Sequence, residues 1–119
     1  MFDIEIDIEK VDKDIALMTL RGSLDSTTDD KLSEALNKLI KDNVYRFVID
    51  LSGVSYIGSP GIGVFISVID ILQSNKGTIV FIYPKPNVKA TFKMFKLSAF
   101  YSIAKDKETA VKELKALCK

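Results

Sequence analysis

Residues 46–75 read RFVIDLSGVSYIGSPGIGVFISVIDILQSN, and the fold class follows from how this stretch is interpreted. Its opening RFVIDL is a short apolar run typical of a buried strand. Residues 62–75 are also apolar and rich in β-branched side chains, which would suit another strand. Their length and the Ser-Pro-Gly entry favour a helix, because proline fits the first helical position and Ser59 is then the N-cap. The stretch therefore predicts a strand followed by a helix, with Ser59 between them.

The first 22 residues predict an antiparallel hairpin. Ile4, Ile6 and Ile8 alternate with acidic residues, which is the period of a strand with one buried face. After the turn candidate VDKD, residues 15–22 have the pattern of a second strand. The acidic face of the first strand suits a sheet edge, where charge discourages pairing with other molecules.

Residues 23–43 predict a helix. Ser26 is the expected N-cap, and Asp29 and Asp30 fall in the first turn, where the helix dipole favours negative charge. The apolar positions at helical spacing are Leu32, Ala35, Leu36, Leu39 and Ile40.

The rest of the chain continues the alternation of strands and helices. We expect Gly77 to cap the end of the helix at 62–75, and Asp106 to cap the start of the last helix. Phe95 has the spacing of a core residue, together with Val88 and Phe92. The expected elements are strands at 76–83 and 100–104 and helices at 86–97 and 106–119.

This order of elements predicts a single α/β domain over residues 1–119. Its sheet is mixed and mostly parallel, with an antiparallel N-terminal edge strand and about four covering helices. Ligand and partner sites in such sheets gather where the carboxyl ends of strands meet the amino ends of helices. Ser59 lies at one of these corners.

Composition argues against most catalytic functions and most charged-surface functions. The 119 residues include one cysteine, Cys118, so no internal disulfide can form. They include no histidine, which is the commonest general base and metal ligand. A net charge of +1 gives no global attraction to nucleic acid or to a membrane. No apolar run approaches the roughly 18 residues of a membrane span, and the N-terminus lacks a signal-peptide pattern. We expect a cytoplasmic protein that is not an enzyme and that holds no cofactor or metal.

The chemistry of the Ser59 position is favourable to an anion. An N-cap hydroxyl lies beside unpaired N–H groups at the positive end of the helix dipole. A phosphate on that oxygen would add about two negative charges where they are favoured. Asp25 and Asp50 each lie near the same end of the sheet, Asp50 as the end of its strand, and we favour structural roles for both.

Two features of the helix after Ser59 have more than one explanation. Gly61 and Gly63 lie in its first turn, although glycine costs about 1 kcal/mol there relative to alanine. Close packing on a strand and close approach by a partner explain them equally well. The broad apolar arc of this helix is either covered by a neighbouring helix or leaves Val64, Val68 or Ile71 at the rim of a docking surface. The narrow polar stripe consists of Gly63, Ser67, Asp70 and Ser74.

Two further features are usually structural. Tyr56 is assigned to packing in the core or at its rim. The helix at 86–97 has a basic side, which is usually a solvated face and would otherwise meet acidic partner residues or nucleotide phosphates. Its lysines are Lys85, Lys89, Lys93 and Lys96.

Residues 48–68, VIDLSGVSYIGSPGIGVFISV, resemble the signature of the STAS domain, as found in bacterial anti-sigma factor antagonists. Members typically carry Asp-Leu-Ser and, a few residues later, Asp-Ser-Ser-Gly-Leu-Gly. Asp50-Leu51-Ser52 matches the first part, and Gly58-Ser59-Pro60-Gly61-Ile62-Gly63 stands at the second. GSLD at residues 22–25 resembles the Gly-x-Leu-Asp that ends the family's second strand.

The resemblance implies a phosphorylation switch without enzymatic activity. The unmodified protein would bind an anti-sigma factor that is also a serine kinase, and so free a sigma factor. Phosphorylation of the motif serine, Ser59 here, would break the complex, and a serine phosphatase would restore it. The implied partner-binding residues are Gly58, Ser59, Pro60, Gly61, Gly63, Val64 and Ser67, with Asp25 and Asp50 in support.

The motif departs from the family pattern at two positions. Gly58 replaces the usual aspartate, which removes a like charge next to a phosphate and leaves the kinase's recognition of this motif open. Pro60 replaces the second serine, so Ser59 is the one acceptor in the motif. Two other functions also suit the fold: a nucleotide or small-molecule sensor that holds an anion at Ser59, and a scaffold subunit of a stress-signalling complex.

Overall fold

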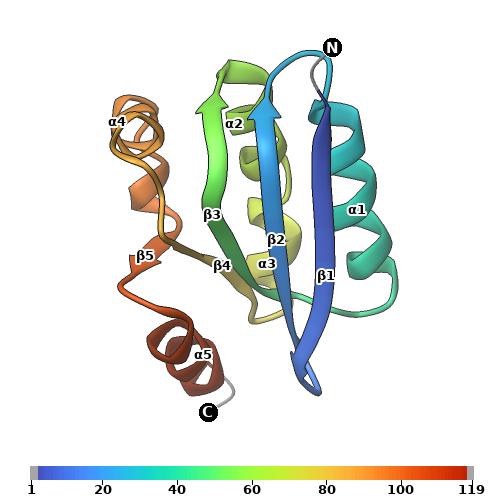
Figure 1. The fold of residues 1–119 in the computed structure, drawn as a ribbon. Coiled ribbons are helices and arrows are strands. Elements are labelled where there is room, and N and C mark those ends of the chain that lie inside the picture. The colour runs from blue at the N-terminus through green and yellow to red at the C-terminus, as the bar shows by residue number, and fades with distance from the viewer. Residues whose placement is uncertain (1–2, 118–119) are drawn as a thin grey trace.

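A five-stranded mixed sheet forms the centre of the chain in a computed structural model, which describes residues 3–117 (Figure 1). Its order is β1-β2-β3-β4-β5, with β1 antiparallel to β2 and every later pair parallel. This confirms the predicted sheet, with the hairpin strand β1 at an edge. The strands are β1 (Ile4–Asp12), β2 (Ile15–Leu24), β3 (Arg46–Ile57), β4 (Thr78–Ile82) and β5 (Ser102–Ala104).

The helices cover the two faces of the sheet unequally. Figure 1 shows α1, α2 and α3 behind the strands, and the larger apolar core lies on this side. A smaller core packs Ala110 and Leu114 of α5 against Val48 and Val80 on the opposite face. The helices are α1 (Asp29–Lys41), α2 (Ser59–Ser67), α3 (Ile69–Ser74), α4 (Pro86–Met94) and α5 (Lys107–Ala116), with a 3₁₀ turn at Leu97–Ala99.

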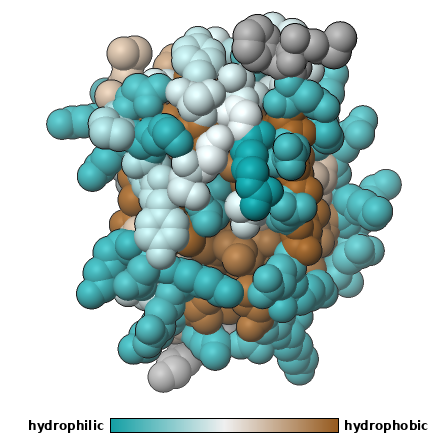
Figure 2. Space-filling view, in the orientation of Figure 1, coloured by the Kyte–Doolittle hydropathy of each residue, from teal (hydrophilic) through white to brown (hydrophobic). Residues whose placement is uncertain are grey.

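The α5 side of the sheet is only partly covered. Figure 2 shows apolar surface at the centre of this face, between rims of hydrophilic side chains. Val11, Leu17 and Val111 are half-buried around the smaller core, because α5 spans only part of the sheet. The face behind the sheet is therefore the main hydrophobic layer.

An aromatic cluster fixes α2 against the sheet. The Phe81 ring of β4 lies 5.0 Å from Phe65 of α2 and 4.7 Å from Phe92 of α4, measured between centroids. The buried Tyr101 ring packs edge-on against Phe81, and its hydroxyl donates to the Phe65 carbonyl at 2.6 Å. Burial raises the pKa of Tyr101, so this hydroxyl remains a donor at neutral pH. The helix that begins at Ser59 thus rests on a rigid base.

The predicted helix at 62–75 is confirmed as helical but is not continuous. α2 ends at Ser67 and α3 starts at Ile69, with Val68 between them. Two carbonyls in the last turn of α2 accept side-chain hydrogen bonds, Phe65 from Tyr101 and Val64 from the Ser67 hydroxyl at 2.6 Å. Such side-chain bonds compete with the helical ladder, which accounts for the break.

The start of α1 also differs from the expectation. The helix begins at Asp29 with Thr28 as its N-cap residue, so the assignment of Ser26 as N-cap is wrong. Residues 26–28 form a turn instead, because the Asp25 carbonyl accepts the N–H groups of Thr28 and Asp29. Asp29 and Asp30 do occupy the first turn, as predicted.

Two predictions near helix ends fail, for different reasons. Asn75 is the C-cap of α3 and Lys76 is left-handed, while the Gly77 N–H donates to the Leu72 carbonyl at 2.7 Å from one residue further on. Gly77 is needed for another reason, since a Cβ there would lie 1.9 Å from the Tyr45 carbonyl oxygen. Phe95 is 43% exposed because α4 ends before it, at Met94.

The last helix begins as predicted. The Asp106 carboxylate accepts a hydrogen bond from the Thr109 N–H at 2.8 Å, and α5 starts at Lys107. Cys118 lies outside the described residues. None of the helices within residues 3–117 has the length and apolarity needed to traverse a bilayer.

Candidate functional site

The ends of β2 and β3 form one corner of the sheet. Leu24 pairs with Ile57, and the Gly58 N–H donates to the Leu24 carbonyl at 2.8 Å. Asp25 and Ser59 therefore follow neighbouring parallel strands at the same edge. We call residues 23–25 and 55–61 the Ser59 corner.

Ser59 is the first residue of α2 and not its N-cap. The Gly58 carbonyl accepts the Ile62 N–H at 3.1 Å, so helical hydrogen bonding begins one residue earlier than predicted, and Gly58 is the N-cap. Ser59 is exposed, and its side chain makes no hydrogen bond to any described residue. Its hydroxyl is thus accessible at the positive end of the helix.

The first turn of α2 leaves donors unused. Pro60 has no N–H, and the Gly58 N–H is already bonded to β2. Within residues 3–117, the N–H groups of Ser59 and Gly61 have no hydrogen-bond partner. No acidic residue lies in this turn. An anion on Ser59 would meet unpaired donors and a favourable dipole without local repulsion.

The two glycines of this turn have different roles. A Cβ on Gly61 would lie 2.9 Å from the Leu24 Cβ and 3.0 Å from the Ile57 Cγ1. Gly61 therefore allows α2 to sit close to both strand ends, as the packing explanation predicts. A Cβ on Gly63 would meet no atom within 4 Å, so packing within the chain does not explain this exposed glycine.

Tyr56 lies over Gly58. A Cβ on Gly58 would lie 3.1 Å from the Tyr56 hydroxyl oxygen and 3.3 Å from its ring. The side chain is 53% exposed, so of the two predicted positions, core and rim, Tyr56 occupies the rim. Because it lies next to Ser59 in the corner, this aromatic ring belongs to the exposed surface of the site.

Asp25 has the structural role that we favoured. Its carboxylate accepts the Thr27 hydroxyl at 2.6 Å and the Thr27 N–H at 2.8 Å, and these bonds lower the pKa of Asp25. The carboxylate thus holds the turn between β2 and α1.

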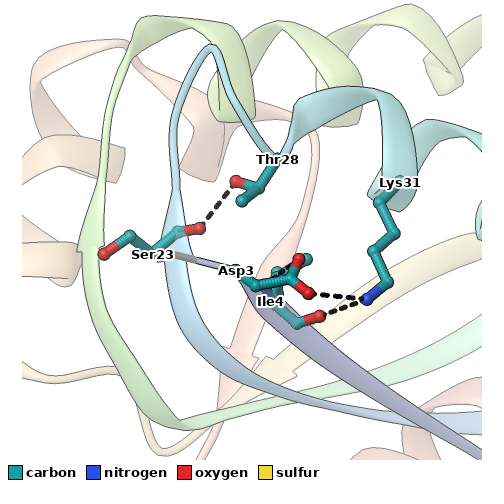
Figure 3. Close-up of polar contacts among 5 residues, drawn as sticks. All are labelled: Asp3, Ile4, Ser23, Thr28 and Lys31. Atoms are coloured by element: carbon teal, nitrogen blue, oxygen red, sulfur yellow. Dashed lines mark hydrogen bonds and ion pairs between the residues drawn. The ribbon is translucent and has the colours of Figure 1, made fainter. Parts of the chain in front are cut away.

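The loop at Asp25 is also fixed by a residue that the sequence analysis missed. Thr28 is almost fully buried, and its hydroxyl donates to the Ser23 carbonyl at 2.7 Å (Figure 3). The same hydroxyl accepts the Asp25 N–H at 3.1 Å. Lys31 of α1 reaches the Ile4 carbonyl at 2.7 Å (Figure 3). The sequence alone does not indicate which of the two threonines is buried.

Asp50 does not belong to the Ser59 corner. We predicted that it ends its strand, but β3 continues to Ile57, which places Asp50 roughly 20 Å away along the strand. Its carboxylate accepts the Ser52 N–H at 2.8 Å. The strand is longer than expected because its second half pairs with β2 as far as Leu24.

The second half of β3 is held on its other edge by α4. β4 ends opposite Asp50, so residues beyond it have no β4 partner. The Asn87 side-chain amide donates to the Ser55 carbonyl at 2.9 Å, and the Lys85 ammonium donates to the Ser52 carbonyl. The start of α4 thus supports the strand that carries the corner, a role that the sequence did not indicate.

The predicted partner-binding residues divide into two groups. Ser59, Gly63 and Ser67 are exposed and Pro60 is half-buried, whereas the other members, Gly58, Gly61 and Val64, are buried.

The apolar arc of the helix is largely covered. Val64 and Val68 are buried and α1 packs against α2, as the explanation by a covering helix predicts for these two residues. Ile71 is 44% exposed, as the docking interpretation predicts, and Ile66, which we had not singled out, is 46% exposed. Within α2 and α3, these two isoleucines are therefore the large apolar side chains that stay exposed.

Metal chemistry finds no support in the described part of the chain. Among residues 3–117, no group of three or more His, Cys, Asp or Glu side chains is arranged to hold a metal ion.

Comparisons with known proteins agree with this architecture. Residues 5–110 match the family model of the STAS domain. The protein BtrV of Bordetella bronchiseptica is 25% identical over 112 residues, which cover 94% of this chain and 96% of that protein. The anti-sigma-B factor antagonist of Listeria monocytogenes is 33% identical over 79 residues, which cover 66% of this chain and 68% of the relative.

The solved structures show the same fold at low identity. The anti-sigma factor antagonist SpoIIAA in its unphosphorylated form superposes with a TM-score of 0.81 at 19% identity, over 94% of this chain and 97% of that one. The phosphorylated form of SpoIIAA, from Bacillus, gives a TM-score of 0.71 at 17% identity, over 91% of this chain and 98% of that one. With a family match across most of its length and a relative above 30% identity, this chain belongs to the STAS domain family.

Proposed function

We propose that this protein is an anti-sigma factor antagonist, switched by phosphorylation of Ser59. In its unmodified form it binds a cytoplasmic anti-sigma factor, which also acts as the serine kinase, and a sigma factor is released. A serine phosphatase returns the phosphorylated protein to the binding form. The observation that carries the proposal is the exposed Ser59 hydroxyl, without an intramolecular hydrogen bond, at the first position of α2.

The relatives support this assignment. The Listeria monocytogenes protein is named an anti-sigma-B factor antagonist, and SpoIIAA is described in both unphosphorylated and phosphorylated forms. The proposal gives the chain no catalytic role and no cofactor of its own. Its part in the switch is to present an acceptor serine on a fixed surface.

The physical basis of the switch is the cost of burying a phosphate. In the free protein, a phosphate on Ser59 lies at the positive end of α2 and is solvated on its other sides. In a complex, a partner surface would remove that water, and the dianion would lose free energy unless the partner supplied new cations. Modification therefore weakens the complex while leaving the fold of the free protein intact.

The buried residues among the proposed partner-binding set position the helix and do not contact the partner. Gly61 and Val64 set the position of α2 against β2, β3 and α1, and Ser59, Gly63 and Ser67 make the direct contacts. Pro60 contributes by fixing the first turn. Gly58 removes a neighbouring carboxylate, and we expect a longer-lived phosphate as a result.

Phosphorylation with a purified kinase tests the proposal. The protein is incubated with ATP and the purified anti-sigma factor kinase of its own organism, and the phosphate is located by mass spectrometry. We expect one phosphate, on Ser59, and none in Ser59→Ala. Ser55→Ala and Ser74→Ala serve as controls, because both serines are exposed and neither belongs to the proposed contact residues, and both variants should still be modified. A phosphate on another residue, or none at all, would contradict the proposal.

A further inference from the structure

The charges of this chain are distributed unevenly between the two edges of the sheet. Residues 71–105 contain no aspartate or glutamate, although they include six lysines. They comprise the end of α3 and then β4, α4 and β5 with their connections, which lead to the β5 edge. The strand at the opposite edge, β1, is rich in acidic residues. The net charge of +1 conceals this separation.

Most acidic residues at the β1 edge have a cationic partner within the chain. Asp7 pairs with Arg21 at 2.6 Å, and Lys31 pairs with Asp3 at 3.5 Å. α5 adds two more ion pairs to the hairpin, Lys107–Glu9 and Lys115–Asp12. An acidic edge with intramolecular partners needs no external cation.

The lysines of α4 and Lys96, just after it, have no such partners. Lys89, Lys93 and Lys96 form no ion pair with any residue between 3 and 117, and all three are exposed. Lys89 and Lys93 are four residues apart, so they lie on the same side of the helix. This side presents positive charge that the rest of the described chain does not neutralise.

A groove runs beside these two lysines. It has a volume of about 450 Å³ and lies between α4 and β5. Ala90 and Pro86 of α4 and the half-buried Ile103 of the edge strand β5 supply apolar surface. The full lining is Pro86, Lys89, Ala90, Phe92, Lys93, Ser98 and Ile103.

We propose that this groove docks an acidic segment of a partner protein, in which carboxylates flank a large apolar side chain. The apolar side chain fits over Ala90 and Ile103, and the carboxylates meet the unpaired ammonium groups of Lys89 and Lys93. A merely solvated basic face needs no apolar hollow beside its charges. A hollow also suits an inserted side chain better than the flat surface of a membrane. The site is separate from the Ser59 corner and does not depend on the proposed phosphorylation.

A random peptide library displayed on phage tests the proposal with the full chain as bait. We expect enriched peptides that carry acidic residues on either side of a large apolar residue. The synthesised peptides should bind the double variant Lys89→Glu/Lys93→Glu about tenfold more weakly or worse. The matched control is Lys10→Glu/Lys13→Glu, which makes the same change of net charge at the opposite edge and should bind them as the unmodified chain does.

Three further arms separate the alternatives. Ala90→Phe fills the groove without changing the charge, so it should also weaken peptide binding about tenfold. A thermal melt of this variant checks that the fold is kept. Ser59→Glu should bind them unchanged, which makes this test independent of the phosphorylation switch. Sedimentation with anionic lipid vesicles tests a membrane surface. The proposal is overturned if no enriched peptide depends on Lys89 and Lys93, if Ala90→Phe binds normally, or if only the vesicles show that dependence.

Discussion

The amino termini of α5 and α2 differ in how the unpaired N–H groups of the first helical turn are satisfied. At α5 the Asp106 carboxylate accepts the Thr109 N–H at 2.8 Å, and this bond lowers the pKa of Asp106. At α2 the sequence Gly58-Ser59-Pro60 supplies no side-chain cap and no acidic residue. One terminus thus carries its own anion, whereas the other leaves unpaired donors beside an exposed hydroxyl.

This difference indicates that an uncapped helix terminus is no defect in itself. The aromatic cluster and Gly61 hold α2 in place, so the helix does not depend on a cap for its position. The stability of α2 is thereby separated from the chemistry of its terminus. A modification of Ser59 can change the surface without unfolding the helix.

The largest effect on stability is expected at the contact that holds α2 down. Gly61→Ala introduces a Cβ within 3.0 Å of Leu24 and Ile57, and these side chains belong to the packed core. We expect a loss of roughly 1–3 kcal/mol in the free energy of unfolding, because overpacking forces the helix away from the sheet. Urea denaturation measures it. An unchanged midpoint would mean that the corner is looser than the structure indicates.

A smaller loss is expected at the capped terminus, and none at the open one. Within residues 3–117, Asp106 is the only N-cap residue whose side chain accepts a hydrogen bond from its helix, and Asp106→Ala should lower the melting temperature by a few degrees. Ser59→Ala removes no hydrogen bond and should leave the melting temperature unchanged. Equal losses in both variants would remove the contrast between the two termini.

The pH dependence of the stability lost in Asp106→Ala tests whether the Asp106 carboxylate is its source. The pKa of Asp106 in the folded chain lies below its ordinary value of 3.8. Its contribution is therefore complete above that pH and is lost as the pH falls through the folded pKa. The stability difference between the unmodified protein and Asp106→Ala should narrow only in that acid range. A difference that narrowed near neutral pH would rule out this carboxylate.

Substitution of Gly63, the exposed glycine of α2, should raise the free energy of unfolding instead of lowering it. Gly63→Ala adds a methyl group where no atom lies within 4 Å, and alanine is the better helix former. We expect a gain of up to about 1 kcal/mol in the free energy of unfolding. If the same variant binds the anti-sigma factor more weakly, the bare backbone serves a partner. A loss of stability would show that Gly63 has a packing role after all.

The smallest effect is expected on the second pKa of a phosphate on Ser59. The second pKa of phosphoserine is about 6, and the helix terminus should lower it by a few tenths in the folded protein. Phosphorus NMR titration of the Ser59 phosphoprotein, folded and in urea, measures the difference. An equal or higher pKa in the folded form would mean that the α2 terminus does not favour a dianion.

The sequence was sufficient for the fold because its local patterns agree with one another. The alternation of Ile4, Ile6 and Ile8 predicts the hairpin strand, and the stripe from Leu32 to Ile40 predicts α1. The Ser59-Pro60-Gly61 entry predicts where a helix follows β3. In each case the signal lies within a few residues of the element that it specifies.

Several of the failures depend on residues that are distant in the chain. The break at Val68 involves the hydroxyl of Tyr101, which lies 36 residues from the Phe65 carbonyl that it contacts. The length of β3 depends on its pairing with β2 as far as Leu24, and not on its own apolar pattern. Asp50 was misplaced for this reason. Gly61 and Gly63 look alike in the sequence, and only the neighbours of each Cβ position separate them.

The most direct test compares two forms of the same protein in one binding experiment. Unmodified chain and chain stoichiometrically phosphorylated on Ser59 are titrated into the purified anti-sigma factor of the same organism, with circular dichroism to check that both are folded. The account predicts that the phosphorylated chain binds at least about a hundredfold more weakly, because a dianion must be desolvated in the complex. Equal affinities of the two folded forms would contradict it.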